Sequence, residues 1–193
     1  TAKIACREGL KNLFVTNGFM TPQAIDLMSP YLAAANVDLK SFRDEFYKKQ
    51  CGARLVPVLD SLKKMKDHGV WLEITTLLIP GLNDSDEELK DIAAFIRTLG
   101  PETPWHISRF HPQFKMLDTP STPVASLRRA CAIGKEKGLH HVYSGNVPGD
   151  EGENTYCSNC HKLLIRRYGF RIIDNFMSGP QCSFCGQKLE GLL

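Results

Sequence analysis

Four cysteines near the end of the chain have the spacing of a metal site. They form two CxxC pairs separated by 21 residues, with ligand candidates Cys157, Cys160, Cys182 and Cys185. In each pair two thiolates can face one metal ion, and two such knuckles complete the tetrahedral sulfur shell that zinc or iron prefers. The spacing therefore predicts a four-thiolate site holding zinc or a single iron. Two disulfides or free thiols are the alternative.

The segment between the two CxxC pairs predicts a small metal ribbon. Residues 163–173 have the pattern of a hairpin whose turn lies near Gly169. About forty residues are too few for a stable apolar core, so metal binding would supply much of the folding free energy. We expect a four-cysteine, rubredoxin-like zinc-ribbon module over residues 150–193. Its basic residues favour a solvated face over nucleic-acid binding.

Composition limits the class of protein. The chain has 193 residues, a formal charge of +3 and 42% hydrophobic residues, which is ordinary for a globular protein and too weakly basic to indicate a nucleic-acid partner. No run is apolar enough for a membrane span. The other three cysteines (Cys6, Cys51 and Cys131) are single, and an odd count with paired spacing favours a reducing compartment, so we expect a cytoplasmic protein.

The rest of the chain alternates strand and helix signals. Strands are expected near residues 13–16, 36–39, 70–79, 105–110 and 139–143. Thr21 before Pro22 predicts a helix start, as does the capping box of Ser85 with Glu88, whereas Gly69 predicts a helix end. The first dozen residues have the pattern of a helix end leading into a strand, which suggests that the natural N-terminus lies upstream.

This alternation predicts an α/β fold with parallel strands and right-handed crossovers over residues 1–149. Four or five strands are too few for an eight-stranded barrel. Since chemistry in such folds collects at the carboxyl ends of strands, attention falls on Thr16-Asn17-Gly18, Asp38-Leu39-Lys40, Pro80-Gly81 and Phe110-His111. Asp38 and Lys40, two residues apart on a strand, should point to one face.

These strand-end motifs resemble the second half of radical S-adenosylmethionine (SAM) activating enzymes, a group that includes the activases of pyruvate formate-lyase. The motifs are Thr16-Asn17-Gly18-Phe19, Asp38-Leu39-Lys40, residues 78–84 (LIPGLND) and Phe110-His111. The phrases DLKSFRDEFYKKQCGARLVPVL and PWHISRFHP, together with the cysteine tail, are similar to the AmmeMemoRadiSam-system radical SAM enzymes. The resemblance covers nearly the whole chain.

The resemblance implies a partial six-stranded βα barrel, of which residues 1–149 would supply about strands three to six. Thr16, Asn17 and Gly18 would line the pocket for the ribose and methionine parts of SAM. Asp38 and Lys40 would reach the same pocket, where Lys40 suits a carboxylate. His111 would close the top of the site.

Two departures from the family pattern matter. The residue before Thr16 is Val15, where the formate-lyase activases have an aspartate, so a cation site that uses this aspartate is in doubt. The CxxxCxxC loop that holds a [4Fe–4S] cluster and the GGE stretch that contacts SAM are both absent from this sequence. The chain alone therefore predicts no cluster site and no confident catalytic residue.

The function implied for the intact protein is that of a radical SAM oxidoreductase. Such an enzyme cleaves SAM to a 5′-deoxyadenosyl radical that abstracts hydrogen from a substrate, here of unknown class with a protein as one candidate, and it needs an electron donor. The four-cysteine tail would be structural, a docking surface or, with iron, an electron relay.

Simpler interpretations stay open at this stage. Asp38 and Lys40 could form a structural ion pair, and His111 could be an ordinary loop residue. His106, His140 and His141 are assigned to structure or surface. Two other functions are a metal-ribbon interaction module on an inert α/β scaffold and an aldolase-like lyase with Lys40 as the amine nucleophile.

Overall fold

A computed structural model describes residues 1–192. Its main element is a five-stranded parallel sheet in the order β1-β2-β3-β4-β5. The strands are β1 (Leu13–Thr16), β2 (Ala34–Asp38), β3 (Trp71–Leu78), β4 (Trp105–Arg109) and β5 (Val142–Gly145). Each strand pairs with the next in sequence, as repeated strand–helix–strand units with a uniform hand require. The predicted α/β class and five strand positions are confirmed.

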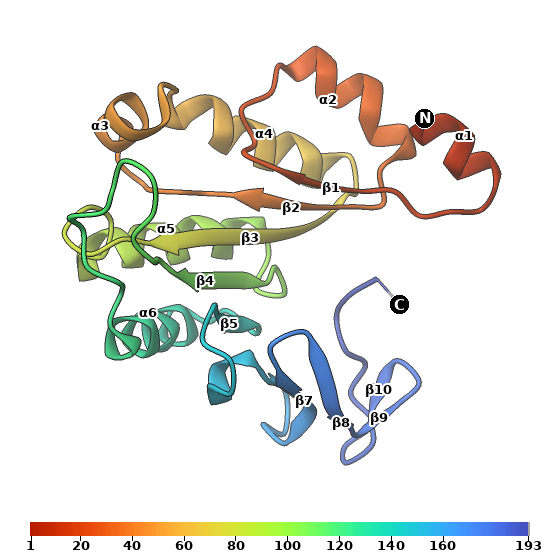
Figure 1. The fold of residues 1–193 in the computed structure, drawn as a ribbon. Helices are drawn as coiled ribbons and strands as arrows, with labels where there is room; N and C mark the ends of the chain where they lie inside the picture. The colour runs from red at the N-terminus through yellow and green to blue at the C-terminus, as the bar shows by residue number, and fades with distance from the viewer. Residues whose placement is uncertain (193) are drawn as a thin grey trace.

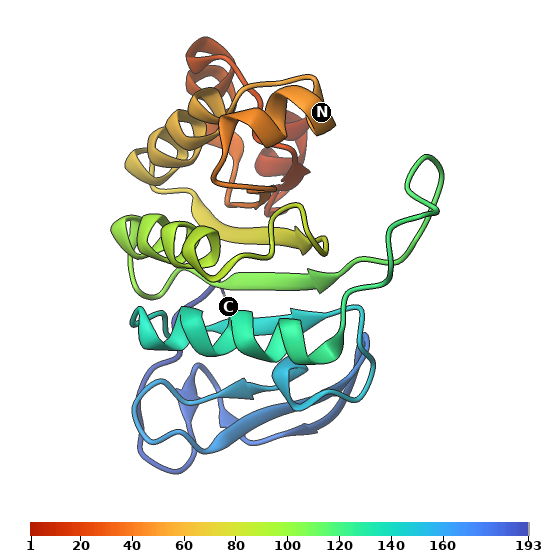
Figure 2. The ribbon, with the colours of Figure 1, turned by 90° about the vertical axis from the view of Figure 1, so that its left-hand side faces the viewer.

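Helices connect the strands and lie along one face of the sheet (Figures 1 and 2). They are α2 (Pro22–Met28) with the 3-10 turn η1 (Ser29–Tyr31), α4 (Leu55–Asp67), α5 (Asp86–Leu99) and α6 (Val124–Glu136). A further short helix, α1 (Ala2–Arg7), precedes β1 and buries no residue. The Thr21 hydroxyl accepts a hydrogen bond from the Ala24 N–H, as the predicted cap requires. After α4 the chain turns at Gly69, whose φ of 76° suits glycine.

The main core fills the space between the sheet and these helices. Along β3, side chains alternate strictly between buried and partly exposed, starting from the partly exposed Trp71. Leu72, Ile74 and Leu78 pack with residues of α4, α5 and α6. The apolar run over residues 70–79 is typical of a buried strand, but only every second residue of β3 is buried, and the other face of the sheet is lined mainly with polar side chains.

A short helical segment after β2 was not predicted. It consists of α3 (Asp44–Phe46) and the π-helical turn η2 (Tyr47–Cys51), and it ends at Gly52, which has φ of 61°. Only two side chains of this segment, Phe46 and Tyr47, are buried. One turn and a π-turn contain too few apolar positions to produce a 3.6-residue pattern, so periodicity could not find it.

The C-terminal module follows β5 and the 3-10 turn η3 (Glu151–Glu153). It contains a three-stranded antiparallel sheet of β6 (Thr155–Tyr156), β7 (Leu163–Tyr168) and β8 (Arg171–Asn175), and a two-stranded ribbon of β9 (Met177–Ser178) and β10 (Gln181–Cys182). Tyr168 pairs with Arg171, so the predicted hairpin turns at Gly169. The module lies beside β5 (Figure 1).

The junction at residue 150 is tied to the sheet domain. The Asp150 carboxylate accepts a hydrogen bond from Ser144 at 2.8 Å and pairs with Arg128 at 3.0 Å. Burial raises the pKa of Asp150, but the Gly152 N–H, Ser144 and Arg128 outweigh burial and leave the pKa below its usual value. The division into residues 1–149 and 150–193 stays a prediction. At this boundary Asp150 is held to the sheet domain by its bonds to Ser144 and Arg128.

In the part of the chain that the structure describes, no helix has the length and apolarity needed to cross a membrane.

The predicted capping box at the start of α5 forms only in part. The Ser85 hydroxyl accepts a hydrogen bond from the Glu88 N–H at 3.3 Å. The Glu88 carboxylate, however, does not return to Ser85: it is buried and accepts hydrogen bonds from the Ser41 hydroxyl and from the Phe42 N–H, the latter at 2.9 Å. Glu88 therefore ties α5 to the loop after β2.

Replacing Glu88 by Ala should lower the free energy of unfolding by about 1–3 kcal/mol, because the Ser41 hydroxyl and Phe42 N–H would lose their buried acceptor. Glu87→Ala is the matched control, since it removes the same charge from the same helical turn at a side chain that is 86% exposed. Chemical denaturation should place E87A within about 0.5 kcal/mol of the wild type. Equal losses in both variants would contradict this role of Glu88.

Candidate functional sites

The four predicted cysteines come together as one cluster of sulfur atoms. Their Sγ atoms all lie within 4.8 Å of one another, with Cys157 and Cys185 at 3.6 Å and Cys160 and Cys182 at 3.7 Å. Tetrahedral zinc with Zn–S bonds of about 2.3 Å requires sulfur separations of about 3.8 Å. All four cysteines are free thiols, so the disulfide alternative is not the structure observed. The donor set and spacing fit a zinc or iron ion.

The two CxxC pairs have the same backbone geometry. The Cys157 N–H donates to the Lys162 carbonyl and the Cys182 N–H donates to the Gln187 carbonyl, at 2.9 and 2.8 Å. Backbone N–H groups also point at sulfur, from Cys160 to Cys157 and from Phe184 to Cys182. Such matched turns are the knuckles that the spacing predicts.

Backbone polarity also prepares one thiol for metal binding. The Gln187 N–H lowers the pKa of Cys185 to about 6. At Cys160 the Lys162 N–H lowers the pKa, but burial and the other three cysteines outweigh it and raise the pKa, so within the cluster Cys185 loses its proton more readily than Cys160. His161, which directly follows the first knuckle, is exposed and has φ of 57°. It does not belong to the group of four ligand atoms found in the described residues.

Loss of one thiolate should release the metal and unfold the module selectively. The module's own core consists of Cys157, Leu164 and Cys182 with a few partly buried neighbours, too small to fold without the ion. We expect Cys160→Ser to lose most of its bound metal, measured by elemental analysis, while far-UV circular dichroism still reports the helices of the sheet domain.

Cys6→Ser is the control for that experiment, because Cys6 is an exposed thiol outside the cluster. It should keep one metal ion per chain. Full metal retention by C160S would contradict the four-thiolate assignment.

The second candidate site lies where the strands end. Asp38 and Lys40 form an ion pair of 2.8 Å, with each side chain about one third exposed. The Lys40 N–H donates to the Tyr47 hydroxyl at 3.1 Å, and the Lys40 carbonyl accepts from the Asn83 amide at 2.6 Å. Asn83 also bonds to the backbone of Leu77 and Ile79, so it links the ends of β2 and β3.

A cavity of about 330 Å³ opens beside this ion pair. Its walls come from the ends of β1, β2 and β3, from the α3–η2 segment and from the loop after β4; they are Asn17, Phe19, Lys40, Phe46, Tyr47, Gln50, Cys51, Ala53, Ile79 and Met116. Burial raises the pKa of Tyr47 to about 12 and also raises that of the Cys51 thiol, so both keep their protons at neutral pH. The structure thus brings Asn17 and Lys40 to one cavity.

Thr16 and Gly18 shape the turn that presents Asn17. The Thr16 hydroxyl accepts a hydrogen bond from the Gly18 N–H at 3.2 Å. Gly18 has φ of 69°, and a Cβ at this position would lie 2.6 Å from Cγ1 of Val37. Both the backbone conformation and the close approach to β2 therefore require glycine.

Gly18→Ala should cost more than an alanine placed at an open left-handed position. Gly69 offers that comparison, since its φ is 76° and nothing lies within 4 Å of the point that an added Cβ would occupy. We expect G69A to lose about 1 kcal/mol from conformation alone, and G18A to lose about 1–3 kcal/mol more from overlap with Val37. Thermal unfolding measures both; equal losses would show that Val37 moves aside at no cost.

Of the predicted cofactor residues only Asn17 and Lys40 line the cavity; Thr16, Gly18 and Asp38 adjoin these two, whereas His111 follows a different strand. It begins the loop of residues 110–121 after β4, is exposed, and is not among the residues lining the 330 Å³ cavity. The same loop contributes Met116 to that cavity. His111 and Lys40 nevertheless follow parallel strands of one sheet, so both lie at the same edge. The role of His111 stays a prediction.

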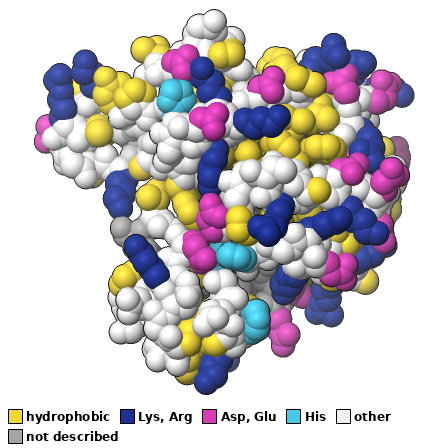
Figure 3. Space-filling view, turned by 180° about the vertical axis from the view of Figure 1, so that it is seen from behind, with side chains coloured by type: hydrophobic (Ala, Val, Ile, Leu, Met, Phe, Trp, Pro, Cys, Tyr) yellow, Lys and Arg dark blue, Asp and Glu magenta, His cyan; other side chains and the backbone are white. Residues whose placement is uncertain are grey.

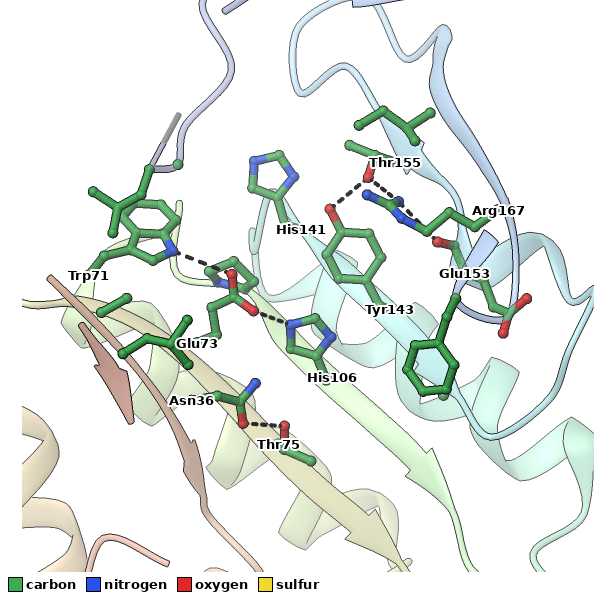
Figure 4. Close-up of a pocket in the computed structure, with 18 of the residues that line it drawn as sticks. Asn36, Trp71, Glu73, Thr75, His106, His141, Tyr143, Glu153, Thr155 and Arg167 are labelled. Atoms are coloured by element: carbon green, nitrogen blue, oxygen red, sulfur yellow. Dashed lines mark hydrogen bonds and ion pairs between the residues drawn. The ribbon is translucent and has the colours of Figure 1, made fainter. Parts of the chain in front are cut away.

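A larger chamber of about 860 Å³ lies on the sheet face without helices (Figure 4). Its floor is made of polar side chains in two hydrogen-bonded pairs, Asn36 with Thr75 at 2.7 Å and Glu73 with His106 at 2.8 Å. The hydrogen bond from His106 lowers the pKa of Glu73. The sequence assigns His106 to structure or surface and singles out no role for Glu73. Both residues alternate with buried apolar residues along their strands, and this pattern was the available signal for a polar face of the sheet.

The opposite wall of the chamber belongs to the C-terminal module. Thr155, Arg167 and Glu190 line it, and Tyr143 on β5 bridges the two parts through a 3.2 Å hydrogen bond to Thr155. Glu190 accepts hydrogen bonds from His140 and His141 at 3.1 Å each (His141 is labelled in Figure 4). In the space-filling view this boundary is a hollow flanked by acidic, basic and histidine side chains (Figure 3).

We compared the sequence and the fold with those of known proteins. Residues 1–96 match the radical SAM superfamily. These residues include the Thr16-Asn17-Gly18 and Asp38-Leu39-Lys40 motifs and the turn after β3. The resemblance stated from the motifs is thus supported at the level of the superfamily.

A relative in Methanocaldococcus jannaschii, the uncharacterized protein MJ0808, is 44% identical over 196 residues. The match includes the whole of this chain and 58% of that protein. The chain therefore spans little more than half the length of this relative.

Several solved structures have a similar fold. A domain of a pyruvate-formate lyase-activating enzyme from Bacteroides vulgatus has a TM-score of 0.66 at 18% identity, over 75% of this chain and 87% of that one. A radical SAM methyltransferase from Sphaerobacter thermophilus gives 0.57 at 14%, over 76% and 46%. SuiB of Streptococcus suis bound to S-adenosylmethionine gives 0.58 at 14%, over 74% and 35%. At these identities the likeness establishes the fold alone.

Proposed function

We propose that this chain is the C-terminal part of a radical SAM enzyme and binds SAM at the carboxyl ends of its strands. The observation that supports the proposal is the Asp38–Lys40 ion pair, whose lysine lines a cavity together with Asn17. This cavity lies at the strand ends of a sheet whose fold resembles that of a pyruvate-formate lyase-activating enzyme domain. Ligands of open α/β sheets bind at this edge.

The residues at this cavity fit one end of SAM. The Lys40 ammonium can exchange part of its contact with Asp38 for the carboxylate of the methionine moiety. Asn17 is exposed at the rim and offers an amide to hydroxyl or amino groups. Tyr47 holds the Lys40 backbone in place from a fully buried position, so the ammonium is positioned from a rigid wall.

The residues of this chain do not fit a [4Fe–4S] cluster of the radical SAM type, since the sequence has no CxxxCxxC loop. We assign that cluster to a segment outside this chain, which the greater length of the archaeal relative accommodates. With the cluster, the superfamily's chemistry is reductive cleavage of SAM followed by hydrogen abstraction. The residues of this chain bind and orient the cofactor and keep water from it.

The sheet has a free edge where further strands could add. In the described residues β1 pairs only with β2, and its Leu13 and Val15 are 64% and 77% exposed. We propose that β1 to β4 are strands three to six of a partial barrel, that β5 continues the sheet, and that preceding strands pair with β1. An apolar edge strand left open would otherwise invite aggregation.

The rim of the site suits a polypeptide substrate, as in the activating enzymes. Large apolar side chains are exposed after the ends of β1, β3 and β4 and at the tip of the β7–β8 hairpin; they are Phe19, Leu82, Phe114, Leu117, Tyr168 and Phe170. The loop after β4 projects beyond the edge of the sheet (Figure 2). Several large apolar side chains exposed on connecting loops are typical of a protein-binding surface. We place the enzyme in the cytoplasm, where an electron donor is at hand.

For the four-cysteine site we propose zinc in a rubredoxin-like module with a structural role. Iron at the same site would make an electron relay possible. Metal analysis of the purified protein separates these two assignments.

The SAM proposal is tested by titrating the full-length protein with SAM in a calorimeter. Lys40→Met should weaken binding about tenfold or more, because a charge-assisted contact to the methionine carboxylate is lost. Lys64→Met is the matched control: Lys64 forms an ion pair of the same 2.8 Å length with Asp26, has similar exposure, and belongs to α4 away from the cavity.

Equal affinities of K40M and K64M for SAM would sink the assignment of Lys40. No SAM binding by the wild type, with metal still bound at the cysteines, would instead favour a metal-ribbon interaction module on an inert scaffold. Formation of 5′-deoxyadenosine by the reduced, anaerobically purified full-length protein is the readout for the radical reaction.

A further inference from the structure

The chamber on the open face of the sheet is continuous with the row of residues that carries the strand-end site. In the sheet register Asp38 lies beside Thr75, Thr75 beside His106, and His106 beside Tyr143. Neighbouring strands are about 4.8 Å apart, so Asp38 and His106 are separated by about 10 Å. A molecule in the chamber would therefore lie within reach of the strand-end cavity while contacting different residues.

One side of the chamber is a row of aromatic rings. His106 and Tyr143 stack with ring centres 5.2 Å apart, and His141 lies parallel to Tyr143 at 6.4 Å. The polar atoms of these rings are held by other residues of the chamber wall: Glu73 binds His106, Glu190 binds His141, and Thr155 binds the Tyr143 hydroxyl. The rings are thus fixed in orientation before any ligand arrives.

Arg167 is the charged group of the chamber that lacks a counter-ion. Its guanidinium donates to the Thr155 hydroxyl at 2.6 Å and to the Glu153 carbonyl at 3.2 Å (Figure 4), and no carboxylate of the described residues lies within ion-pair distance. The nearby Glu153 carboxylate is used elsewhere, since it accepts the N–H groups of Gly149 and Gly169.

The other carboxylates of the chamber are also engaged, Glu73 by His106 and Glu190 by His140 and His141. A half-buried guanidinium without an acidic partner has lost part of its hydration and gained only neutral acceptors. Such a group binds an anion favourably, and its planar fork matches a carboxylate.

We infer that this chamber binds an organic carboxylate, with Arg167 as the partner of the anionic group and the His106–Tyr143–His141 row against the body of the molecule. Arg167 lies on β7, so the four-cysteine module contributes a residue to the binding site. Because the module needs its metal to fold, binding of the carboxylate also depends on the metal.

The probe is benzoate, which has a flat ring and one carboxylate, compared with benzamide, which has the same shape without the charge. Both are titrated into the full-length, metal-loaded protein by calorimetry, and Trp71, which lines the chamber, gives a second signal by fluorescence. We expect benzoate to bind about tenfold more tightly than benzamide. Trp71→Phe should remove the fluorescence response but leave the calorimetric signal.

Arg167→Gln should abolish the preference for benzoate over benzamide. Arg171→Gln is the matched control, because Arg171 is an exposed arginine of the same hairpin that does not line the chamber, and it should keep the full preference. Circular dichroism and metal content establish that both variants are folded. Arg167→Lys should retain a weaker preference, since the charge stays while the fork is lost.

Removal of the metal by a chelator should abolish benzoate binding while the helices of the sheet domain persist. The inference is overturned if benzoate and benzamide bind equally, if R167Q and R171Q behave alike, or if the metal-free protein binds benzoate unchanged. None of these titrations includes SAM or a cluster, so their failure leaves the SAM proposal standing, and failure of SAM binding leaves the carboxylate site standing.

Discussion

The whole arrangement depends on a parallel sheet that is covered by helices on one face only. Parallel sheets are usually buried on both faces, which gives continuous apolar strands. Here the strands alternate, and the uncovered face carries polar side chains that satisfy one another across strands, as Asn36 does with Thr75 and Glu73 with His106. Because no helix covers this face, the chamber can form on it. The opposite face packs on the helices and forms the apolar core that supports the strands of the chamber floor.

At the carboxyl edge of the sheet, buried polar residues add to the apolar packing of Phe46, Ile79 and Phe110. Asn83 bonds to backbone groups that follow β2 and β3, and Glu88 holds the loop after β2 from the first turn of α5. Loops at this edge have many backbone groups without partners in the sheet. Because these two side chains bond to several of them, Lys40 projects from a loop that is held by hydrogen bonds, which suits the SAM-binding role proposed for it.

Elements with local signals could be predicted from the sequence, and elements that depend on distant partners could not. The strand positions, the Thr21 cap and the cysteine knuckles each follow from a few adjacent residues. The sequence predicts that the Glu88 carboxylate caps its own helix. In the structure this carboxylate instead accepts a buried hydrogen bond from Phe42, 46 residues earlier in the chain. The α3–η2 segment was missed because it is a single turn followed by a π-turn.

The same limit explains why the chamber could not be found from the sequence. His106 was visible as a histidine in a strand, but its partner Glu73 is 33 residues away and their contact exists only because β3 and β4 pair in one register. Arg167 was interpreted as part of a solvated basic face. Its position toward the chamber depends on where the module rests against β5, and no spacing within residues 150–193 encodes that.

The two edges of the sheet show what the module contributes to the fold. At β1 the edge is open and exposes Leu13 and Val15, whereas at β5 the module lies alongside and makes polar contacts through Tyr143 and Asp150. An edge strand needs a cover or a partner. The module lies alongside β5, whereas β1 pairs only with β2 in the described residues, so β1 is the edge at which the preceding strands proposed above would pair. The C-terminal module is therefore a wall of the domain, and a metal ion at its four cysteines would help to close the face on which the polar side chains lie.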